Sequence, residues 1–120
     1  MMGDDPRRLP QTPLGLPYAV EQAHMGHPDF RVKGKIFAAM GSPDAGSATV
    51  KLTPEEQAVV MDAAPDIFAP SDGAWGRGGW TQLRLAALDA TTAKSALTAA
   101  WRNVAPKKLV VEFDAERHAS

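Results

Sequence analysis

The stretch F-R-V-K-G-K-I-F-A, residues 30–38, contains the pattern that decides the fold. Apolar and charged residues alternate through its first half, which is the period of a half-buried β-strand. The pair Lys33-Gly34 predicts a two-residue hairpin turn, because glycine supplies the positive φ that such turns require. A second strand then returns over Lys35–Met40. Strands joined by so short a turn are antiparallel, so the sequence predicts an antiparallel sheet.

The chain that follows this hairpin continues the sheet and then enters a helix. Ala48–Leu52 alternates again and predicts a third strand. Thr53 is the predicted cap of a helix that runs to about Ala64. Pro54 fits the first turn of this helix, and Glu56, three residues after the cap, completes a capping box.

The rest of the sequence predicts two more strands and one long helix. The strands are 67–69 and Thr81–Leu85, on either side of a glycine-rich loop. The helix starts near Asp89 and ends before Pro106. Apolar residues recur through it at three- and four-residue steps, as on a helix that faces a core. The last apolar run, Leu109–Phe113, predicts either a final strand or an extended tail.

These elements give the order helix, three strands, helix, two strands, helix, written α-β3-α-β2-α. The short turns and the lack of crossovers predict an α+β two-layer plate, in which helices cover one face of an antiparallel sheet. We expect a single domain over 1–120. The first helix of this order is predicted within 4–16, with Asp5 as its N-cap and Pro6 at its first position. Pro10 and Pro13 interrupt this helix, so an irregular N-terminal segment is expected over 1–13. Residues 110–120 are expected to form a tail.

The composition is that of an ordinary globular protein, with 44% hydrophobic residues, 22% charged residues and a net charge of −1. The sequence has no cysteine, which excludes disulfides, thiolate nucleophiles and Cys-ligated metals and fits a reducing cytoplasm. No apolar run approaches the roughly 20 residues of a membrane span. We therefore expect a cytoplasmic protein that does not enter a membrane.

Charge is segregated along the chain. Five acids and no base occupy 52–76, whereas cations dominate 31–51 and 77–108. We expect these acids to lie on the helical side of the plate, where they do not cancel the positive electrostatic potential of the opposite face. Strand alternation gives that opposite face the residues Arg31, Lys33, Thr49, Lys51, Gln82 and Arg84. Lys35 lies on the same face if the odd-numbered residues of its strand point outward.

The glycine-rich loop, G-A-W-G-R-G-G-W at 73–80, combines two indoles with a cation. Aromatic rings beside cations are typical of nucleic-acid surfaces, because the rings stack on bases and arginine binds phosphate. Glycines on both sides let Trp75 fold back on the sheet, so we interpret it as an anchor of the loop. Trp80 shares the outward parity of Arg84, and with Arg77 these residues form the predicted stacking surface.

Four blocks of the sequence, in the family's order, resemble the MmcQ/YjbR family: H-M-G-H-P-D-F-R-V-K-G-K-I-F-A (24–38), V-K-L-T-P-E-E-Q-A (50–58), G-A-W-G-R-G-G-W-T-Q-L-R-L (73–85) and A-W-R-N-V-A-P-K-K-L (100–109). The resemblance implies an α+β fold of the secretion-chaperone-like type, which is also similar to the frataxin-like fold. It further implies DNA binding through a double-wing arrangement. It brings no catalytic residues.

The sequence offers little for catalysis or for a metal. His24 and His27 have the spacing of a metal pair, but a zinc site needs three or four ligands, and the third histidine, His118, lies in the tail. The glycines of the 73–80 loop lack the spacing of a phosphate-binding loop. We therefore expect a non-enzymatic protein with no metal and no cofactor.

The sequence thus favours a monomeric domain that contacts DNA through a basic sheet face, with the Lys33-Gly34 turn and the 73–79 loop as wings. The alternative is a protein- or peptide-binding module, in which the same open sheet, with Trp80 as anchor, meets an acidic segment. The residues predicted to contact nucleic acid are Arg31, Lys33, Lys35, Lys51, Arg77, Trp80 and Arg84.

Overall fold

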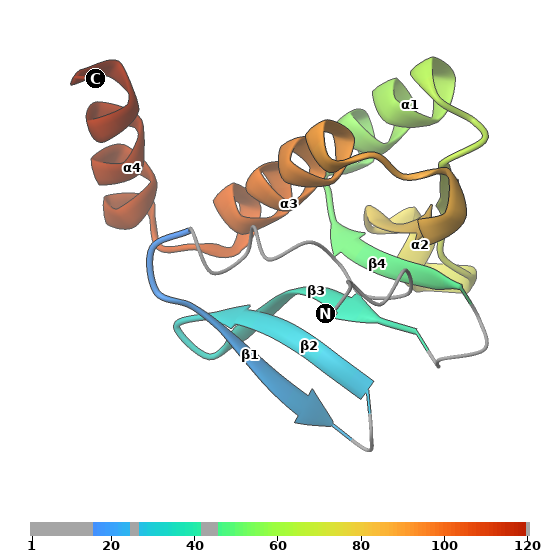
Figure 1. Ribbon diagram of the computed structural model, residues 1–120, viewed down its shortest axis with the longest axis horizontal. Helices are drawn as coiled ribbons and strands as arrows, with labels where there is room; N and C mark the ends of the chain where they lie inside the picture. Colours follow the sequence, from blue (N-terminus) through green and yellow to red (C-terminus); the bar gives the residue numbers. More distant parts are fainter. Residues whose placement is uncertain (1–15, 25–26, 42–45, 120) are drawn as a thin grey trace, which may run out of the picture.

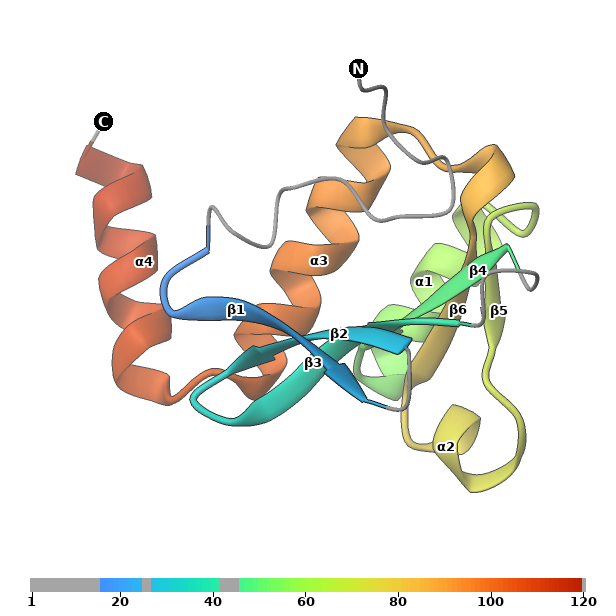
Figure 2. The same cartoon turned by 60° about the horizontal axis from the view of Figure 1, so that its bottom comes forward.

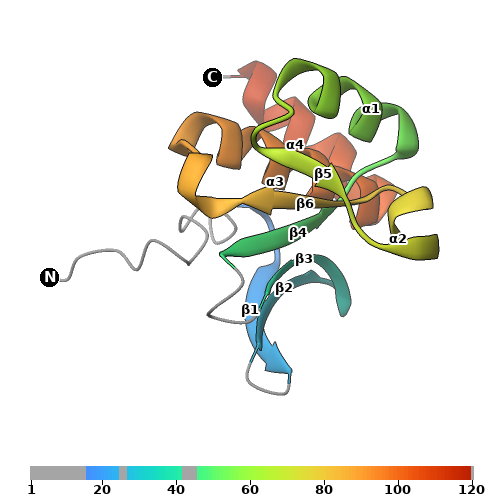
Figure 3. The ribbon, with the colours of Figure 1, turned by 90° about the vertical axis from the view of Figure 1, so that its right-hand side faces the viewer.

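The computed structural model describes residues 16–24, 27–41 and 46–119. Its six strands form one antiparallel sheet in the order β1-β2-β3-β4-β6-β5, which Figure 3 shows from β5 at the top to β1 and β2 at the bottom. The strands of this described part are β1 (Ala19–His24), β2 (His27–Val32), β3 (Lys35–Met40), β4 (Ser47–Lys51), β5 (Phe68–Pro70) and β6 (Trp80–Arg84).

The helices lie mainly on one side of this sheet. They are α1 (Pro54–Ala63), α2 (Gly73–Arg77), α3 (Ala90–Val104) and α4 (Lys107–Ala119), with a 3₁₀ turn at Leu85–Ala87. Figure 1 shows α1, α3 and α4 along one side, and α3 packs against β3 and β4. The short α2 projects away from α3 at the other side of the strands (Figure 2). The predicted α+β fold, an antiparallel sheet with its main helices on one face, is therefore confirmed.

The β2–β3 hairpin has the turn that the sequence predicts. Lys33 and Gly34 both have positive φ, 51° and 84°, as a two-residue turn that matches the strand twist requires. The register shifts between Phe30 and Arg31, which leaves Phe37 as an extra residue in β3. Because of this bulge, simple alternation does not decide which residues of β3 point to which face of the sheet.

The capping box at the start of α1 is confirmed. The Thr53 hydroxyl accepts a hydrogen bond from the Glu56 amide at 3.1 Å, and Glu56 Oε1 accepts one from the Thr53 amide at 2.9 Å. The Asn103 side chain of α3 also donates to Glu56 Oε1, at 2.7 Å. These bonds tie the start of α1 to the end of α3, although no residue within Pro54–Ala63 is itself buried.

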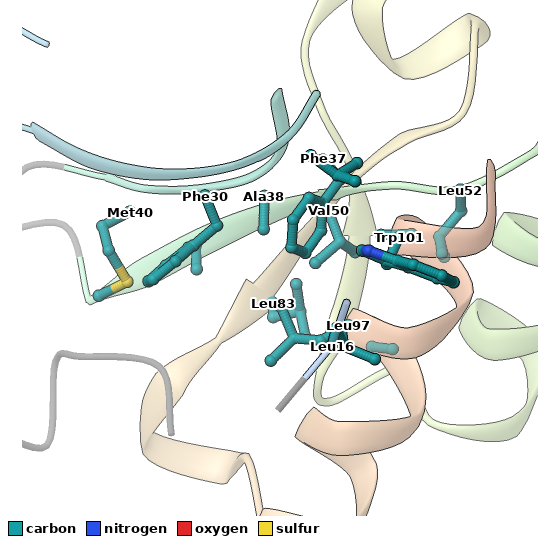
Figure 4. Close-up of a cluster of buried hydrophobic side chains, with 14 of the residues drawn as sticks. Leu16, Phe30, Phe37, Ala38, Met40, Val50, Leu52, Leu83, Leu97 and Trp101 are labelled. Atoms are coloured by element: carbon teal, nitrogen blue, oxygen red, sulfur yellow. The ribbon is translucent and has the colours of Figure 1, made fainter. Parts of the chain in front are cut away.

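The core lies between the sheet and α3, where Trp101, Phe37 and Leu97 are fully enclosed (Figure 4). The apolar stripe predicted for α3 faces this core, since Ala93, Ala96 and Ala100 are buried as well. Trp101 also uses its polar atom, because its indole N–H donates to the carbonyl oxygen of Pro17 at 3.0 Å. This bond fixes the segment that enters β1 against α3.

The first difference from the sequence prediction is β1. The segment A-V-E-Q-A-H has few strong strand formers, and the prediction placed a helix and an irregular segment before the hairpin. β1 forms because it pairs with β2 along its whole length, from Ala19 opposite Val32 to His24 opposite His27. The order α-β3-α-β2-α is therefore wrong at this end, and the predicted irregular segment 1–13 lies outside the described residues.

The second difference is α4, which occupies the place of the predicted final strand or tail. Leu109 is buried, and Phe113, one helical turn later, packs on Trp101 with ring centroids 5.0 Å apart. Helical spacing against the core therefore outweighs the strand propensity of Val110 and Val111. The glycine-rich loop likewise contains a short helix, α2, which its composition did not indicate.

Candidate functional site

The face of the sheet that points away from α3, here called the outer face, has the residues that strand alternation predicts. In the β4–β6 pair they stand opposite each other, Lys51 and Trp80, Thr49 and Gln82, Ser47 and Arg84. In β3, Ala39 lies opposite Thr49 and continues this surface. The outer face therefore mixes cations, hydroxyls and apolar groups.

A groove of about 690 Å³ crosses the outer face between the β2–β3 turn and α2, and we call it the wing groove. Its volume is in the range of sites that hold small molecules. Residues of the sheet form its floor, while the turn and the α2 loop form its ends. The groove is lined by Arg31, Gly34, Lys35, Ile36, Ala39, Thr49, Ser71, Asp72, Trp75 and Trp80.

Trp75 and Trp80 meet edge to face, with ring centroids 6.0 Å apart and ring planes at 70°. Trp80 is half-buried, whereas Trp75 is 67% exposed. Trp75 thus folds back toward the sheet as predicted, but it is not a buried anchor. Together the two rings give the wing groove an open aromatic wall.

The glycine loop is held by Gln57 of α1, a residue that sequence reasoning missed. Its side-chain nitrogen lies 3.0 Å from Gly76 O, 3.1 Å from Trp80 O and 3.2 Å from Thr81 Oγ1. No local signal marks Gln57, because these partners are 19 to 24 positions away along the chain. Gln57 therefore links the helical side of the plate to the aromatic wall.

Close packing of the backbone explains why two positions of the loop are glycine. A Cβ atom at Gly76 would lie 1.9 Å from Ser71 O, and one at Gly79 would lie 1.9 Å from Leu52 O. Gly79 also has a φ of 109°, a conformation that glycine adopts readily and other residues do not. The close approach of these backbones is what positions Trp75 and Trp80 beside each other.

Arg31 is not a free cation. Its Nε donates to Asp29 Oδ1 at 2.9 Å and its Nη2 to Asp29 Oδ2 at 3.1 Å. The side chain of Asp29 is only 4% exposed, and that of Arg31 is 24% exposed. The hydrogen bond to Asp29 raises the pKa of the Arg31 guanidinium above its ordinary value. Sequence reasoning assigned Arg31 to phosphate, but a buried carboxylate already balances its charge.

Two of the predicted lysines lie against aromatic rings. Lys51 Nζ is 5.7 Å from the centre of the Trp80 ring and donates to Gly78 O at 2.8 Å. Lys33 Nζ is 4.0 Å from the centre of the Tyr18 ring, a cation–π contact. Neither partner is an acid, so both lysines still contribute positive charge to the surface.

The remaining predicted cations are exposed but do not gather in one place. Lys35 lines the wing groove, and Arg77 lies at the end of α2. Arg84 is four residues from Trp80 along β6, roughly 13 Å at the usual rise of a strand. It lines a separate hollow of about 280 Å³. The structure therefore brings Lys35 to the aromatic wall. Arg77 follows Trp75 by two residues in α2 but does not line the wing groove, and Arg84 lies elsewhere.

One acid contradicts the expected separation of charge. Asp72 lines the wing groove, although we expected every acid of 52–76 to lie on the helical side. Glu55, Glu56 and Asp62 do lie on α1, as expected. Because Asp72 adds a negative charge to the groove and Asp29 balances the positive charge of Arg31, the outer face is less basic than the sequence predicts.

Metal ligands do not cluster within the described part of the chain, where no three histidine, aspartate or glutamate side chains are arranged to hold an ion. The side chains of His24 and His118 lie outside that part, so the expectation of no metal stays a prediction. In 16–24, 27–41 and 46–119, no helix has the length and apolarity needed to cross a membrane.

The six-stranded open sheet with its helices on one face defines an α+β domain whose fold is shared with a solved structure. The crystal structure of Deinococcus radiodurans protein DR2400, a DUF419 domain, is similar to this chain with a TM-score of 0.63 and 19% sequence identity, over 75% of this chain and 70% of that chain. The YjbR family model matches residues 14–103, so the chain belongs to the YjbR family. The resemblance of the four sequence blocks is thereby confirmed. None of the curated proteins compared with the chain matches it.

Proposed function

We propose that the protein is a monomeric, non-enzymatic cytoplasmic domain that needs no cofactor and binds single-stranded nucleic acid in the wing groove. The observation that carries this proposal is the edge-to-face pair of Trp75 and Trp80, in which Trp75 is 67% exposed. Lys35 lines the same groove, and Lys51 Nζ lies 5.7 Å from the centre of the Trp80 ring. Bases stack on such rings with about 1–3 kcal/mol per base, and they do so regardless of sequence.

The aromatic wall favours an unpaired strand over a duplex. In a duplex the bases stack on one another, and a protein meets only the backbone and the edges of the bases in the grooves. A single strand instead exposes base faces that Trp75 and Trp80 can cover. The pairing of Arg31 with Asp29 also removes one of the phosphate contacts that binding of a duplex on the outer face would use.

Three cations near the aromatic wall have no acidic partner among the described residues: Lys35, Lys51 and Arg77. Neutralising about three phosphates of a single strand gives a slope of about −2 for log K against log salt concentration. Because the net charge of the chain is −1, we expect modest affinity, in the ~10⁻⁴ to 10⁻⁶ M range of non-specific binding at physiological salt.

Fluorescence anisotropy of a labelled short oligothymidine strand tests this proposal. We expect binding at low salt, a slope of about −2 across a salt series, and weaker binding of a duplex of the same length. Tryptophan fluorescence should change in the same titration, because a base that stacks on Trp75 alters its surroundings. The absence of binding at low salt and high protein concentration would exclude a nucleic-acid role.

A pair of double variants separates contacts made by the wing groove and α2 from general electrostatic attraction. Lys35→Ala with Arg77→Ala should flatten the salt slope by roughly 1.4, which is the share of two phosphate contacts on a single strand. The control is Lys94→Ala with Lys108→Ala, two exposed cations on α3 and α4. The control removes the same charge from the helical side, and its slope should stay near that of the unmodified protein.

A second candidate function is the binding of an acidic peptide, and the apolar part of the wing groove favours it. Ile36 and Ala39 line the groove between its two ends and suit an apolar side chain of an extended peptide. Lys35 would then meet an acidic residue. Oligothymidine that fails to bind, together with an acidic peptide that binds and loses affinity in Trp80→Ala, would favour this candidate.

A further inference from the structure

Two hydrogen-bonding groups in the wall of the wing groove are unused within the described protein. Asp72 is the N-cap of α2, where an aspartate usually accepts a hydrogen bond from its helix, but its side chain accepts none. Ser71, the residue before it, has a buried hydroxyl oxygen without a hydrogen-bond partner. Both residues line the groove together with Trp75 and Trp80. The wall therefore combines a stacking surface with an exposed carboxylate and with a buried hydroxyl that has no hydrogen-bond partner.

A carboxylate is an unexpected group on a surface that binds an anionic strand, since it repels phosphate. Its position becomes favourable when it meets hydrogen-bond donors, because an ionised carboxylate only accepts hydrogen bonds. Unstacked bases offer such donors on their Watson–Crick edges, and proteins that bind single strands read these edges. Asp72 thus points to recognition of a base rather than of the backbone.

Guanine matches a carboxylate better than the other bases do. Its Watson–Crick edge carries two adjacent donors, N1–H and the N2 amino group, which fit the two oxygens of one carboxylate in a bidentate contact. Cytosine and adenine offer one amino group beside a ring nitrogen that accepts hydrogen bonds. Thymine and uracil offer one N–H between two carbonyl groups, which repel a carboxylate.

We propose that the wing groove contains a guanine-selective base site. In it the guanine ring stacks on the Trp75–Trp80 wall, and Asp72 accepts hydrogen bonds from N1–H and the N2 amino group. The Ser71 hydroxyl donates to the neighbouring O6 atom after rotation about its Cα–Cβ bond. This inference rests on the proposed function, to which it adds selectivity for one base.

Four labelled strands of equal length test the base site by fluorescence anisotropy. One contains only thymine, and the other three carry a single central guanine, hypoxanthine or cytosine in the same thymine background. We expect the guanine strand to bind at least about fivefold more tightly than the thymine strand, the lower end of what one bidentate base contact discriminates. Hypoxanthine lacks the N2 amino group, so it should lose most of this gain, as should cytosine.

Two variants with the same change in charge show whether Asp72 is responsible. Asp72→Asn should abolish the preference for guanine and should leave thymine-strand binding equal or stronger, since one repulsive charge is removed. Asp62→Asn, at an exposed position of α1, should keep the preference. Equal affinity for the guanine and thymine strands, with the thymine strand still bound, overturns the base site but not the proposed function. A preference that survives in Asp72→Asn also overturns it, and no binding by any strand overturns both proposals.

Discussion

Arg31 holds the buried carboxylate of Asp29 with two hydrogen bonds, of 2.9 and 3.1 Å, on the outer face of the sheet. Because the Asp29 side chain is 4% exposed, its charge depends on this partner. Arg31→Ala leaves that charge uncompensated and should lower the free energy of unfolding measured in urea. The control is Arg84→Ala, an exposed arginine of β6, with an expected change within about 0.5 kcal/mol. Equal losses in the two variants would contradict this structural role of Arg31.

The pH dependence of stability should reveal the cap of α3. Asp89 accepts hydrogen bonds from the Thr92 amide at 2.7 Å and from the Thr92 hydroxyl at 3.0 Å. The amide bond lowers the pKa of Asp89 from its ordinary value of 3.8. The folded protein therefore binds this proton less readily than the unfolded chain does. The stabilisation is fully present above pH 3.8 and is lost as the pH falls through the folded pKa.

Asp89→Ala should accordingly be less stable than the unmodified protein at neutral pH, and the difference should shrink in acid. The control is Asp89→Asn, which keeps a capping oxygen without a charge that titrates. Its stability should approach that of the unmodified protein at low pH, where Asp89 itself is neutral. Urea midpoints between neutral pH and about pH 2.5 measure both differences. A constant difference for Asp89→Ala over this range would rule out the charged cap.

Two glycines with positive φ should respond very differently to alanine. A Cβ atom at Gly79 would lie 1.9 Å from Leu52 O, whereas one at Gly34 would have no atom within 4 Å. Gly34→Ala should therefore cost only the backbone strain, about 1–2 kcal/mol. Gly79→Ala adds a backbone clash, and we expect a loss of about 3 kcal/mol or more. Similar losses in urea denaturation for both variants would show that the Gly79 loop yields easily.

The part of the fold that can be predicted from the sequence is the part with local causes. The turn at Lys33-Gly34 and the cap at Thr53 each depend on residues within four positions, and both form as predicted. β1 depends instead on its pairing with β2, and α4 depends on the packing of Phe113 against Trp101 of α3. Both are contacts between separate elements, so the residues within each segment do not reveal them. Propensity and alternation do not contain these tertiary contacts.

The candidate site also has features that local sequence predicts and features that only tertiary contacts decide. Alternation correctly places Lys51 and Trp80 on the outer face. The sequence could also have predicted the Asp29–Arg31 pair, because residues two apart in a strand project from the same face. The position of Asp72 in the wing groove follows from the path of the α2 loop, which Gln57 and the glycines fix through contacts far along the chain. No sequence spacing encodes that path.

Gln57 should matter for both stability and the geometry of the aromatic wall. Gln57→Ala removes the side-chain hydrogen bonds to Gly76 O and Trp80 O, which keep only their backbone donors, Gly79 N and Ser71 N. We expect a loss of about 0.5–1.5 kcal/mol in the free energy of unfolding. Acrylamide should also quench the tryptophan fluorescence of the folded variant more strongly. The exposed residue Gln22 of β1 provides the control, since Gln22→Ala should change neither quantity. An unchanged quenching curve for Gln57→Ala would mean that the loop holds its shape without this side chain.

Trp75 offers the sharpest separation of stability from binding. Its ring is 67% exposed, so Trp75→Ala should change the free energy of unfolding by no more than about 0.5 kcal/mol. The same variant should weaken oligothymidine binding about five- to hundredfold, because stacking contributes about 1–3 kcal/mol per base. Val59→Ala is the matched control, since Val59 is an equally exposed apolar residue on α1, 67% exposed and outside the wing groove. It should leave binding unchanged, and Trp75→Phe should restore part of the loss. Equal binding by Trp75→Ala and the unmodified protein would show that Trp75 does not stack on a base. That result would favour the second candidate function, the binding of an acidic peptide.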